Sequence, residues 1–323
     1  MNWRRRIFCA TLFVMTSLGM LYAQKAVGPN RPANVPSDYV ITPFGYFHPS
    51  CVRQARQGET VLADGRLRFA DGSEETTAPV CGFPRYSPTG APLVEGLSNP
   101  DPLSISWSWI ESGQVATSTT YDAVLATWTV PQTPTSNDGQ TLFFFPALTH
   151  NHLTPPSEEP IIQPVLGWND GQNAGPWNIA SWNCCPAGMT WNSTPVTVNP
   201  GDQIQGTVMS ACGAALVTAC SKYTITTEDV TTGQSTTLNV SFPSLENFVW
   251  AQSGVLEVYS IYQCSDFPPD GSITFSNVAL FDNHFRRITS PGWAPELFVT
   301  QGQTTPWCNY GVTVTDTTAT LTY

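Results

Sequence analysis

Short runs of β-branched and aromatic residues alternate with turn residues along most of this chain. Nine such runs follow residue 103, and turns such as 200–202 (PGD) and 231–234 (TTGQ) separate them. Apolar residues in this part do not recur at the spacing of a helix. The pattern predicts one all-β sandwich or barrel of roughly 220 residues rather than two domains. The expected strands span 123–130, 141–145, 195–198, 203–208, 223–227, 236–242, 255–262, 272–280 and 311–323.

The first 23 residues have the composition of a secretory signal peptide. Three arginines (Arg4, Arg5 and Arg6) precede an apolar stretch over residues 7–21, and residues 21–23 (LYA) end on a small residue suited to cleavage. The apolar stretch is short for a membrane span, and no stop-transfer pattern follows it. We expect a secreted, extracellular protein with no membrane association in its mature form.

Cysteine usage agrees with secretion. An even number of cysteines in an oxidising compartment predicts a disulfide framework, and the paired spacings of a zinc site are missing. We therefore expect no metal and no other cofactor. A bond between the neighbours Cys184 and Cys185 would strain the backbone, so we expect them to pair with different partners. After removal of Cys9 with the signal peptide, the chain keeps Cys51, Cys81, Cys184, Cys185, Cys212, Cys220, Cys264 and Cys308.

Charge and composition divide the rest of the chain into two parts. Residues 24–86 carry seven cations and six acids, whereas from Ser87 onward three cations face 18 acids. We expect an N-terminal region over 24–102, rich in Pro and Gly, and a sandwich domain over 103–323. A small hairpin, stapled by the cysteines on either side of it, is expected at residues 60–69.

The charge asymmetry suggests a role for each part. The N-terminal region is a possible propeptide whose cations dock on the acidic domain. The acidic domain is not expected to bind nucleic acid or an anionic membrane. Its low density of charge suits a protein that works in acid, although ordinary solubility explains the acidity equally well.

Glu257 is a carboxylate in apolar surroundings. It lies within residues 255–262 (VLEVYSIY), where strand alternation puts it on one face with Val255, Tyr259 and Ile261. A carboxylate on such a face loses hydration, and its pKa should rise toward the range of a general acid or base. The alternative is a structural glutamate that bonds to groups of the neighbouring strands.

Gln163 is an amide in a similar apolar run, residues 160–168 (PIIQPVLGW). Its N–H group would suit a developing oxyanion, but a satisfied core amide is the alternative. Pro164 predicts an edge strand or a bulge. Four tryptophans crowd the following stretch, and they either floor a groove for a peptide or a sugar or pack in the core. These are Trp168, Trp177, Trp182 and Trp191.

Six segments resemble motifs of the glutamic peptidases (eqolisins), and they occur along the chain in the same order as in that family. The eqolisins are secreted acid peptidases with a two-sheet sandwich of concanavalin type. Residues 160–168 resemble the family's I-L-Q-T-G-V-D strand, and residues 256–258 (LEV) fall where the family has A-E-W. The remaining segments are 121–131 (YDAVLATWTVP), 196–208 (VTVNPGDQIQGTV), 228–236 (EDVTTGQST, similar to E-N-L-T-T-G-Q-S) and 272–277 (SITFSN, similar to V-T-F-T-N).

The resemblance implies a two-sheet antiparallel β-sandwich, concanavalin- or jelly-roll-like, that is a monomeric acid endopeptidase acting on polypeptides. It puts Gln163 and Glu257 at the positions of the family's catalytic Gln and Glu. Glu257 would take a proton from the attacking water and return it to the leaving amine, while Gln163 would stabilise the oxyanion. The implied substrate-binding residues are Trp168, Trp177, Trp182 and Asn183.

Two departures from the family motifs touch the expected cleft. The family's W-V-G-I-D-G corresponds to residues 145–150 (FPALTH), which lack the Asp. Its W-Y-E-W corresponds to residues 181–184 (SWNC), with Asn183 in place of the acid.

Other functions stay open on the sequence. A carbohydrate-binding, lectin-like sandwich fits the tryptophans, and a catalytically inactive relative fits the departures. A glucanase would need alternating carboxylates on one strand, such as E-x-D-x-E, and a serine hydrolase would need G-x-S-x-G. The sequence contains neither pattern.

Overall fold

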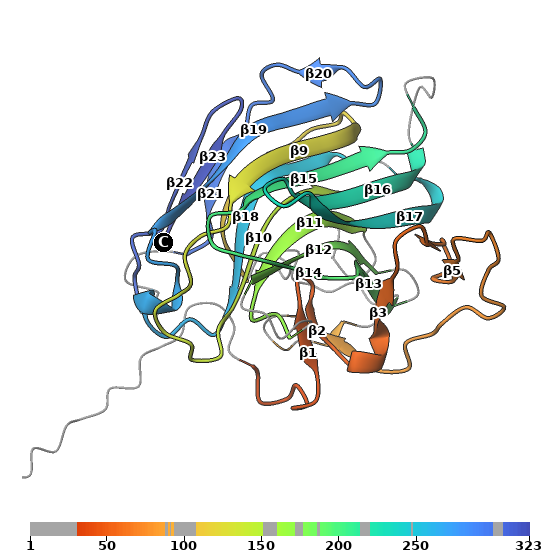
Figure 1. The fold of residues 1–323 in the computed structure, drawn as a ribbon, viewed down its shortest axis with the longest axis horizontal. Helices are drawn as coiled ribbons and strands as arrows, with labels where there is room; N and C mark the ends of the chain where they lie inside the picture. Colours follow the sequence, from red (N-terminus) through yellow and green to blue (C-terminus); the bar gives the residue numbers. More distant parts are fainter. Residues whose placement is uncertain are drawn as a thin grey trace, which may run out of the picture.

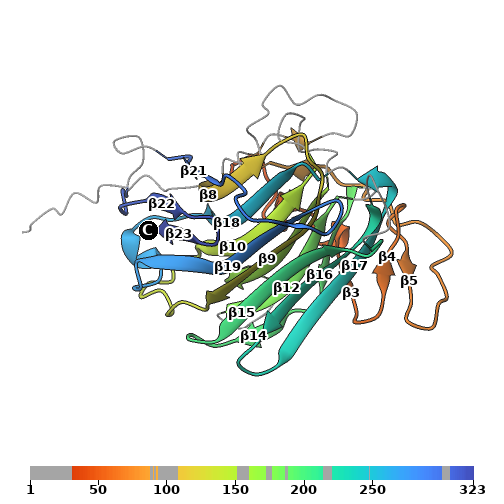
Figure 2. The same ribbon diagram turned by 90° about the horizontal axis from the view of Figure 1, so that it is seen from above.

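The computed structural model describes residues 31–87, 90, 92–93, 108–150, 160–171, 177–185, 188–213, 220–246, 248–299 and 306–323. The expected signal peptide (1–23) lies outside this part of the chain. Two large sheets pack face to face in a sandwich, as Figures 1 and 2 show, and a small four-stranded sheet accompanies them. The expected all-β sandwich is confirmed. Within the described residues, no helix is long and apolar enough to cross a membrane.

The nine-stranded sheet carries the candidate functional residues. Its central strands are antiparallel, and its edge strand β3 runs parallel to β13. In spatial order it consists of β21 (Ala294–Leu297), β8 (Trp109–Ala116), β18 (Trp250–Tyr259), β10 (Thr141–Thr149), β11 (Ile161–Trp168), β12 (Trp177–Cys184), β13 (Thr190–Ser193) and β3 (Val52–Ala55), with β14 (Val196–Val198) also paired to β12.

The ten-stranded sheet forms the opposite layer. Its order is β22 (Gly311–Val314), β23 (Ala319–Thr322), β19 (Ser272–Asp282), β9 (Tyr121–Thr129), β15 (Gln203–Ser210), β16 (Cys220–Asp229), β17 (Gln234–Glu246), β4 (Thr60–Val61) and β5 (Leu67–Arg68), with β20 (Arg287–Ile288) paired to β19. The small sheet consists of β1 (Val40–Thr42), β2 (Gly45–Phe47), β6 (Arg85–Tyr86) and β7 (Pro92–Leu93).

Alternation along β10 divides its side chains between two apolar clusters. Leu142 and Phe144 point inward and join a core made by both large sheets. Phe143 and Phe145 point outward and join a second cluster, which the N-terminal region covers with Tyr46 and its neighbours. Because both faces of this sheet are buried, β10 (TLFFFPALT) is apolar at most positions instead of alternating.

Most expected strands are present, usually with longer bounds. The last run, 311–323, is a hairpin of two strands, β22 and β23, rather than one strand. β8, β12 and β13 were not expected.

Of the two alternatives predicted from Pro164, the edge strand is wrong, since β11 lies in the middle of the sheet between β10 and β12. The register of β10 and β11 sets Pro146 opposite Pro164. Neither proline has an N–H group to donate, so the two missing hydrogen bonds interrupt the ladder at a single place.

All eight cysteines of the expected mature chain form disulfides. Cys184 bonds to Cys185, so the expectation that these neighbours have different partners is wrong. The other six pair at Cα separations of 5.3 to 5.8 Å, within the range that disulfides favour, and leave these two to each other. The four bonds are Cys51–Cys81, Cys184–Cys185, Cys212–Cys220 and Cys264–Cys308.

The N-terminal region is built into the sandwich. β3 extends the nine-stranded sheet beside β13, and β4 extends the ten-stranded sheet beside β17. The ion pairs with acids that the structure describes for its arginines stay inside the region, while two arginines contact the sandwich domain in other ways: Arg53 lies over the ring of Trp191 at 4.5 Å, and Arg85 donates to Cys184 Sγ at 3.5 Å. The ion pairs are Arg53–Glu75, Arg66–Asp64, Arg66–Glu74 and Arg68–Glu74.

Candidate functional site

The outer face of the nine-stranded sheet gathers both residues that the sequence singled out. Glu257 on β18 shares this face with Val255 and Tyr259, as alternation predicts. Gln163 on β11 lies opposite Trp182, another member of the outward cluster. Its neighbour Pro164 points inward and packs closely on Gly206 of the other sheet. The contact is so close that a Cβ atom added at Gly206 would lie 2.6 Å from the proline ring.

Ile261 does not share this face, contrary to the prediction. β18 ends at Tyr259, and Ser260 follows with a positive φ of 59°. This turn sends Ile261 into the inner core instead.

Three side-chain donors surround the carboxyl group of Glu257. Ser108 Oγ and the Tyr259 hydroxyl donate to Oε1 at 2.7 and 2.9 Å, and Trp109 Nε1 donates to Oε2 at 3.1 Å. Burial raises the pKa of Glu257 from 4.5 to about 8, although these hydrogen bonds oppose the shift. The predicted direction of the shift is confirmed. The acid is thus neutral below about pH 8, and its acceptors already have partners.

Gln163, unlike Glu257, has polar side-chain atoms without hydrogen-bond partners in the described structure. Its side chain is fully buried, and neither its amide nitrogen nor its amide oxygen has a hydrogen-bond partner in the described structure. Buried polar atoms are rarely left without a partner, because each loses its bonds to water.

The structure does not bring Gln163 and Glu257 together. Glu257 lies opposite Phe143, whereas the β10–β11 register sets Gln163 opposite Ala147, four positions further along β10. Four residues of strand span about 13 Å and two strand spacings about 10 Å, so the two Cα atoms are about 16 Å apart. Two side chains that reach about 5 Å from Cα and two hydrogen bonds of about 3 Å span this distance only if all of them lie along one line in the plane of the sheet. Side chains of a strand stand out from the sheet instead, so a water shared by these two residues is disfavoured.

Gln252 on β18 is the residue that shares a transverse row with Gln163. It lies opposite Ala147, the small residue of β10 that stands between the two glutamines. Oriented to satisfy its neighbours, its amide nitrogen donates to Ala147 O (3.2 Å) and Thr149 Oγ1 (3.3 Å), and its oxygen accepts from Trp250 Nε1 (3.1 Å). Gln252 therefore leans over β10 in the direction of Gln163.

This row continues to both sides of the sheet. Gln114 on β8 lies opposite Gln252, and Trp182 on β12 stands between Gln163 and Asn192 on β13. Within the described structure, both amide atoms of Asn192, the indole nitrogen of Trp182 and the amide oxygen of Gln114 lack hydrogen-bond partners. We call Gln114, Gln252, Gln163 and Asn192 the amide row. From β8 to β13 it crosses five strand spacings, about 24 Å.

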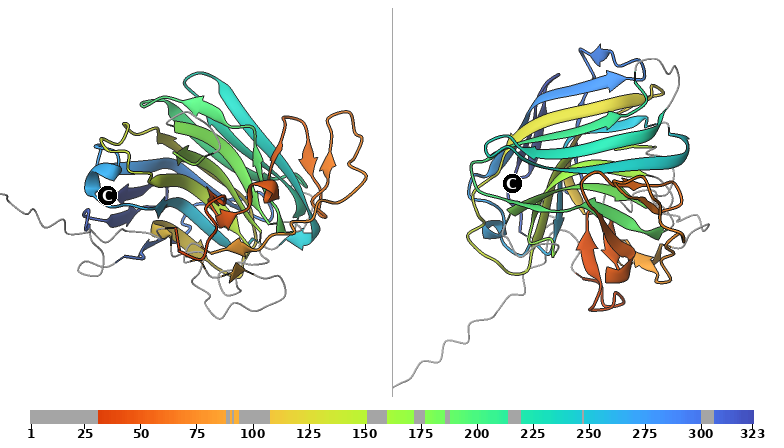
Figure 3. Two further views of the ribbon diagram at one scale, coloured as in Figure 1. Left: turned by 90° about the horizontal axis from the view of Figure 1, so that it is seen from below. Right: turned by 45° about the vertical axis from the view of Figure 1, so that its right-hand side comes forward.

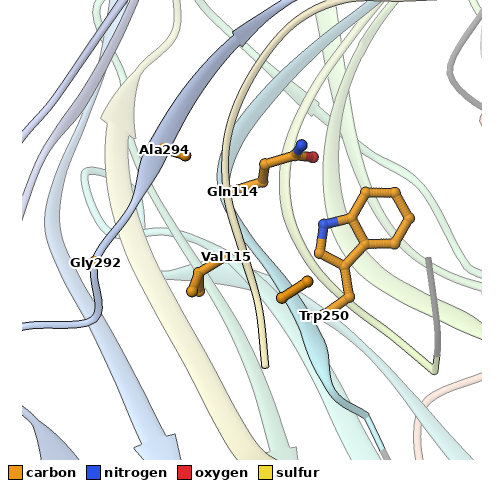
Figure 4. Close-up of a pocket in the computed structure, with 6 residues that line it drawn as sticks. Gln114, Val115, Trp250, Gly292 and Ala294 are labelled. Carbon is orange, nitrogen blue, oxygen red and sulfur yellow. The ribbon is translucent and has the colours of Figure 1, made fainter. Parts of the chain in front are cut away.

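An open pocket adjoins the β8 end of the amide row. It has a volume of about 230 Å³, and Figure 4 shows the amide of Gln114 and the indole of Trp250 on the same side of it. The indole nitrogen of Trp250 is also the group that holds Gln252. Of the amide row, Gln114 alone is among the residues that line this pocket.

The hairpin of β1 and β2 covers the middle of the outer face. The Phe44 ring meets Trp182 at a centroid distance of 6.2 Å, and the Tyr46 ring meets Tyr259 at 5.7 Å. Thr42 O lies 3.4 Å from the Tyr259 hydroxyl, the same hydroxyl that donates to Glu257. Figures 1 and 3 show this N-terminal segment, red to orange, beside the green strands β11 to β13. We call residues 40–47 the cover hairpin.

Three of the four predicted substrate-binding residues lie on the other face of the sheet. Trp168 and Trp177 pack in the core between the sheets, and Asn183 lies opposite the inward residue Ile162. Alternation along β12 separates Trp177 and Asn183 from Trp182, which does face Gln163. Which of these residues face Gln163 depends on whether they occupy odd or even positions of a strand relative to it, and the spacing of the tryptophans in the sequence did not determine this.

The sequence analysis missed Gln252 and a second buried acid. Glu111 on β8 is fully buried on the inner face, where its Oε1 accepts from Gly311 N, and burial raises its pKa to about 9. Each follows an apolar residue but is followed by Ser-Gly, so neither has the apolar flanks on both sides that marked Glu257. Searched over its described residues, the chain holds no group of three or more His, Cys, Asp or Glu suited to a metal ion.

Comparison with known proteins found similar folds among solved structures. Scytalido-glutamic peptidase with a peptide-based transition state analog is 15% identical, with a TM-score of 0.47, and the match covers 67% of this chain and 98% of that one. SCP-B, an eqolisin in complex with the tripeptide Ala-Ile-His, is 16% identical over the same 67% and 98%, with a TM-score of 0.43. The aspergilloglutamic peptidase from Aspergillus niger is 19% identical, with a TM-score of 0.39, over 57% of this chain and 98% of that one.

No protein-family profile and no curated protein matches the chain. At identities below 20%, the similarity concerns the fold and assigns no role to a residue of this chain.

Proposed function

We propose that this protein binds an extended polypeptide across the outer face of its nine-stranded sheet. The observation that carries the proposal is the amide row, in which Gln163 and Asn192 are buried with all their amide atoms unpartnered among the described residues. An amide side chain offers both a donor and an acceptor, as each peptide unit of a polypeptide backbone does. At about 3.4 Å per residue, the row of about 24 Å accommodates roughly seven residues of extended chain.

Polypeptide fits this face better than a glycan. A segment of polypeptide, the cover hairpin, already lies on it and contacts Trp182 and Tyr259 through aromatic rings. The solved structures of similar fold were also determined with peptide ligands.

Peptide hydrolysis is the second candidate function, and the buried acid Glu257 on the same face favours it. In this mechanism Glu257 accepts a proton from water, which requires the carboxylate form. With a pKa of about 8, Glu257 is protonated across the acid range, and Gln163 is too far away to share its water. The geometry therefore favours binding over hydrolysis in the form of the protein described here.

The N-terminal region then acts as a removable cover of the site. The cover hairpin contacts Trp182 and Tyr259, and Gln163, Gln252 and Glu257 are all buried beneath this side of the sandwich. A ligand reaches them only when residues 40–47 move away or are cut off. This agrees with a propeptide in residues 24–102, held by strand pairing, by aromatic contacts and by the arginine contacts of Arg53 and Arg85.

The test of the proposal compares the binding of a peptide with the binding of an oligosaccharide. Fluorescence anisotropy of a labelled, extended heptapeptide is followed with the wild type and with Gln163→Leu, and a labelled oligosaccharide serves as the competing ligand. We expect the peptide to bind the wild type and Gln163→Leu to weaken binding about tenfold, the effect of roughly one to two lost hydrogen bonds. Binding of the oligosaccharide but not of the peptide would contradict the proposal.

Digestion of a denatured protein between pH 2 and 7 examines the second candidate. The wild type is compared with Glu257→Gln and Gln163→Ala. We expect no cleavage by any of the three. Cleavage that both substitutions abolish would favour the Glu257 mechanism and show that the two residues meet in another conformation.

A further inference from the structure

We propose that the open pocket at the β8 end of the amide row holds an arginine side chain, so that the bound polypeptide carries an arginine at the end that lies over Gln114. This inference rests on the proposed function, because it needs a polypeptide along the row. It adds to that function the residue type that the ligand presents at one end.

The pocket has the size and the neutral walls that a single long side chain needs. Its volume of about 230 Å³ equals that of about eight water molecules at about 30 Å³ each, and an arginine side chain has roughly seven non-hydrogen atoms. None of the lining residues is charged, so a cation that enters meets no repulsion from the walls. The lining consists of Gln114, Val115, Ala116, Trp250, Gly292 and Ala294.

Gln114 and Trp250 provide the two kinds of contact that a guanidinium group makes. The Oε1 atom of Gln114 is buried and has no hydrogen-bond partner in the described structure, so it calls for a donor. Figure 4 shows the Trp250 indole beside this amide. A guanidinium group has donors only, and its flat surface stacks on aromatic rings. An ionised acidic side chain offers only acceptors and would leave Gln114 Oε1 without a donor.

Glu296 on β21 provides a negative charge beside the pocket. Ala294 lies opposite Gln114, and Glu296 lies opposite Ser112, which itself lies opposite the outward residue Val255. Alternation therefore puts Glu296 on the same face as Ala294, about 7 Å further along the strand. A glutamate side chain reaches about 4 Å from its Cα atom, so its carboxylate comes within ion-pair distance of a cation above Ala294.

The carboxylate of Glu296 is available for such a ligand. It is partly exposed, and within the described structure it makes no ion pair and no hydrogen bond. The charge of the domain acts in the same direction, since three cations face 18 acids from Ser87 onward and attract a cationic peptide.

Lysine and tyrosine are the competing occupants of the pocket. Lysine would pair with Glu296, but its ammonium group has no flat surface to stack on the indole of Trp250. Tyrosine would fill the volume and donate to Gln114, but it would leave Glu296 without a partner. Arginine alone of these three satisfies the amide oxygen, the indole and the carboxylate together.

The experiment compares peptides that differ at one end. Isothermal titration uses seven-residue peptides, acetylated and amidated and otherwise neutral, with arginine, citrulline, lysine or tyrosine at the first or the last position. Citrulline has nearly the shape of arginine but no charge. The peptides are titrated into the wild type and into a protein with a loosened cover hairpin, Phe44→Ser with Tyr46→Ser.

We expect arginine at one of the two ends to bind about tenfold more tightly than citrulline, through a cation–π contact and a partly exposed ion pair. This preference should shrink as the salt concentration rises. Glu296→Gln should lower it to about threefold or less. Glu228→Gln on β16 of the other sheet, the matched control, removes the same charge and should leave the preference unchanged. Ala294→Leu, at an exposed position, fills the pocket and should abolish the preference.

The outcomes separate the two proposals. Peptides that bind with equal affinity whether they carry arginine or citrulline would overturn the inference and leave the proposed function standing. Lysine or tyrosine binding as tightly as arginine would do the same, as would an equal loss of preference in Glu296→Gln and Glu228→Gln. Failure of every peptide to bind, in both backgrounds, would overturn the proposed function and the inference with it.

Discussion

At the scale of single residues, the unpartnered amide groups are the strongest statement that the structure makes about function. Asn192 lies at the β13 end of the amide row, two strands away from Gln163 and on the opposite side of it from Gln252. Its two amide atoms are buried without partners in the described structure, and no reacting atom is expected near it. Asn192 is therefore a positioning residue that acts on affinity.

Asn192→Leu is expected to weaken binding of an extended heptapeptide about fivefold to tenfold, because one to two hydrogen bonds of about 1 kcal/mol are lost. Leucine has a similar volume, so stability should change little or rise as the unpartnered amide is removed. Fluorescence anisotropy measures the affinity. Thr226→Val, on the opposite sheet, is the matched control, and an affinity equally reduced in both variants would count against the amide row.

The sequence predicted part of this site and missed the part that depends on register. Glu257 and Gln163 stand out because each interrupts an apolar run, and their burial on one face follows from alternation. Their separation of four positions along β10 could not be predicted, since it depends on how β10, β11 and β18 align across the ladder. Gln252 lacks this local signal, because Ser253 and Gly254 follow it, and it stands out only through the pairing that puts it opposite Ala147.

At the scale of elements, the cover hairpin controls access to the site. Gly45 connects its two strands with a φ of 103°, and a Cβ added there would clash with Tyr86 O of the neighbouring strand. A substitution at Gly45 therefore acts on the cover and leaves the amide row itself intact.

Gly45→Ala is expected to raise peptide affinity severalfold, because the hairpin loses its turn and its packing on β6. Limited proteolysis should also cut residues 31–87 sooner than in the wild type. Gly72→Ala is the matched control, since Gly72 has a φ of 86° and open space around its Cβ position. Unchanged affinity in Gly45→Ala, together with faster proteolysis, would show that the hairpin does not limit access.

Strand existence was predictable at this scale, and strand placement was not. The runs at 123–130 and 272–280 are strands because β-branched and aromatic residues favour the pleated surface. Pro164 suggested an edge or a bulge. β11 is central, and its ladder with β10 is interrupted where Pro146 lies opposite Pro164, so both prolines are accommodated at one place. The adjacent cysteines were misjudged for a similar reason, since distances between distant cysteines decide the pairing.

At the scale of the whole molecule, two buried acids tie stability to pH. The pKa of Glu257 is raised to about 8 and that of Glu111 to about 9 by burial, against an ordinary value of 4.5. Between pH 4.5 and these values the folded protein binds protons that the unfolded chain has released. The free energy of unfolding therefore falls as pH rises through this window, by up to about 1.4 kcal/mol per unit for each acid.

The melting temperature is expected to be highest near pH 4 to 5 and up to roughly 20 °C lower at pH 8, since the two acids together change the free energy of unfolding by up to about 10 kcal/mol over this range. Glu111→Gln and Glu257→Gln should each flatten this decline, because the neutral amide has no proton to lose. Glu228→Gln, at a partly exposed position of β16, should leave the profile unchanged. Differential scanning calorimetry across pH 3 to 9 measures the effect, and a melting temperature that rises from pH 5 to pH 8 would contradict it.

The central claim is that a polypeptide lies across the strands, along the amide row from Gln114 to Asn192. Isothermal titration of the loosened-cover protein (Phe44→Ser with Tyr46→Ser) with peptides of two to ten residues tests it most directly. The claim predicts an affinity that rises with length up to about seven residues, the number that spans about 24 Å, and then levels off. An affinity that is already constant from two or three residues, or no binding at any length, would contradict it.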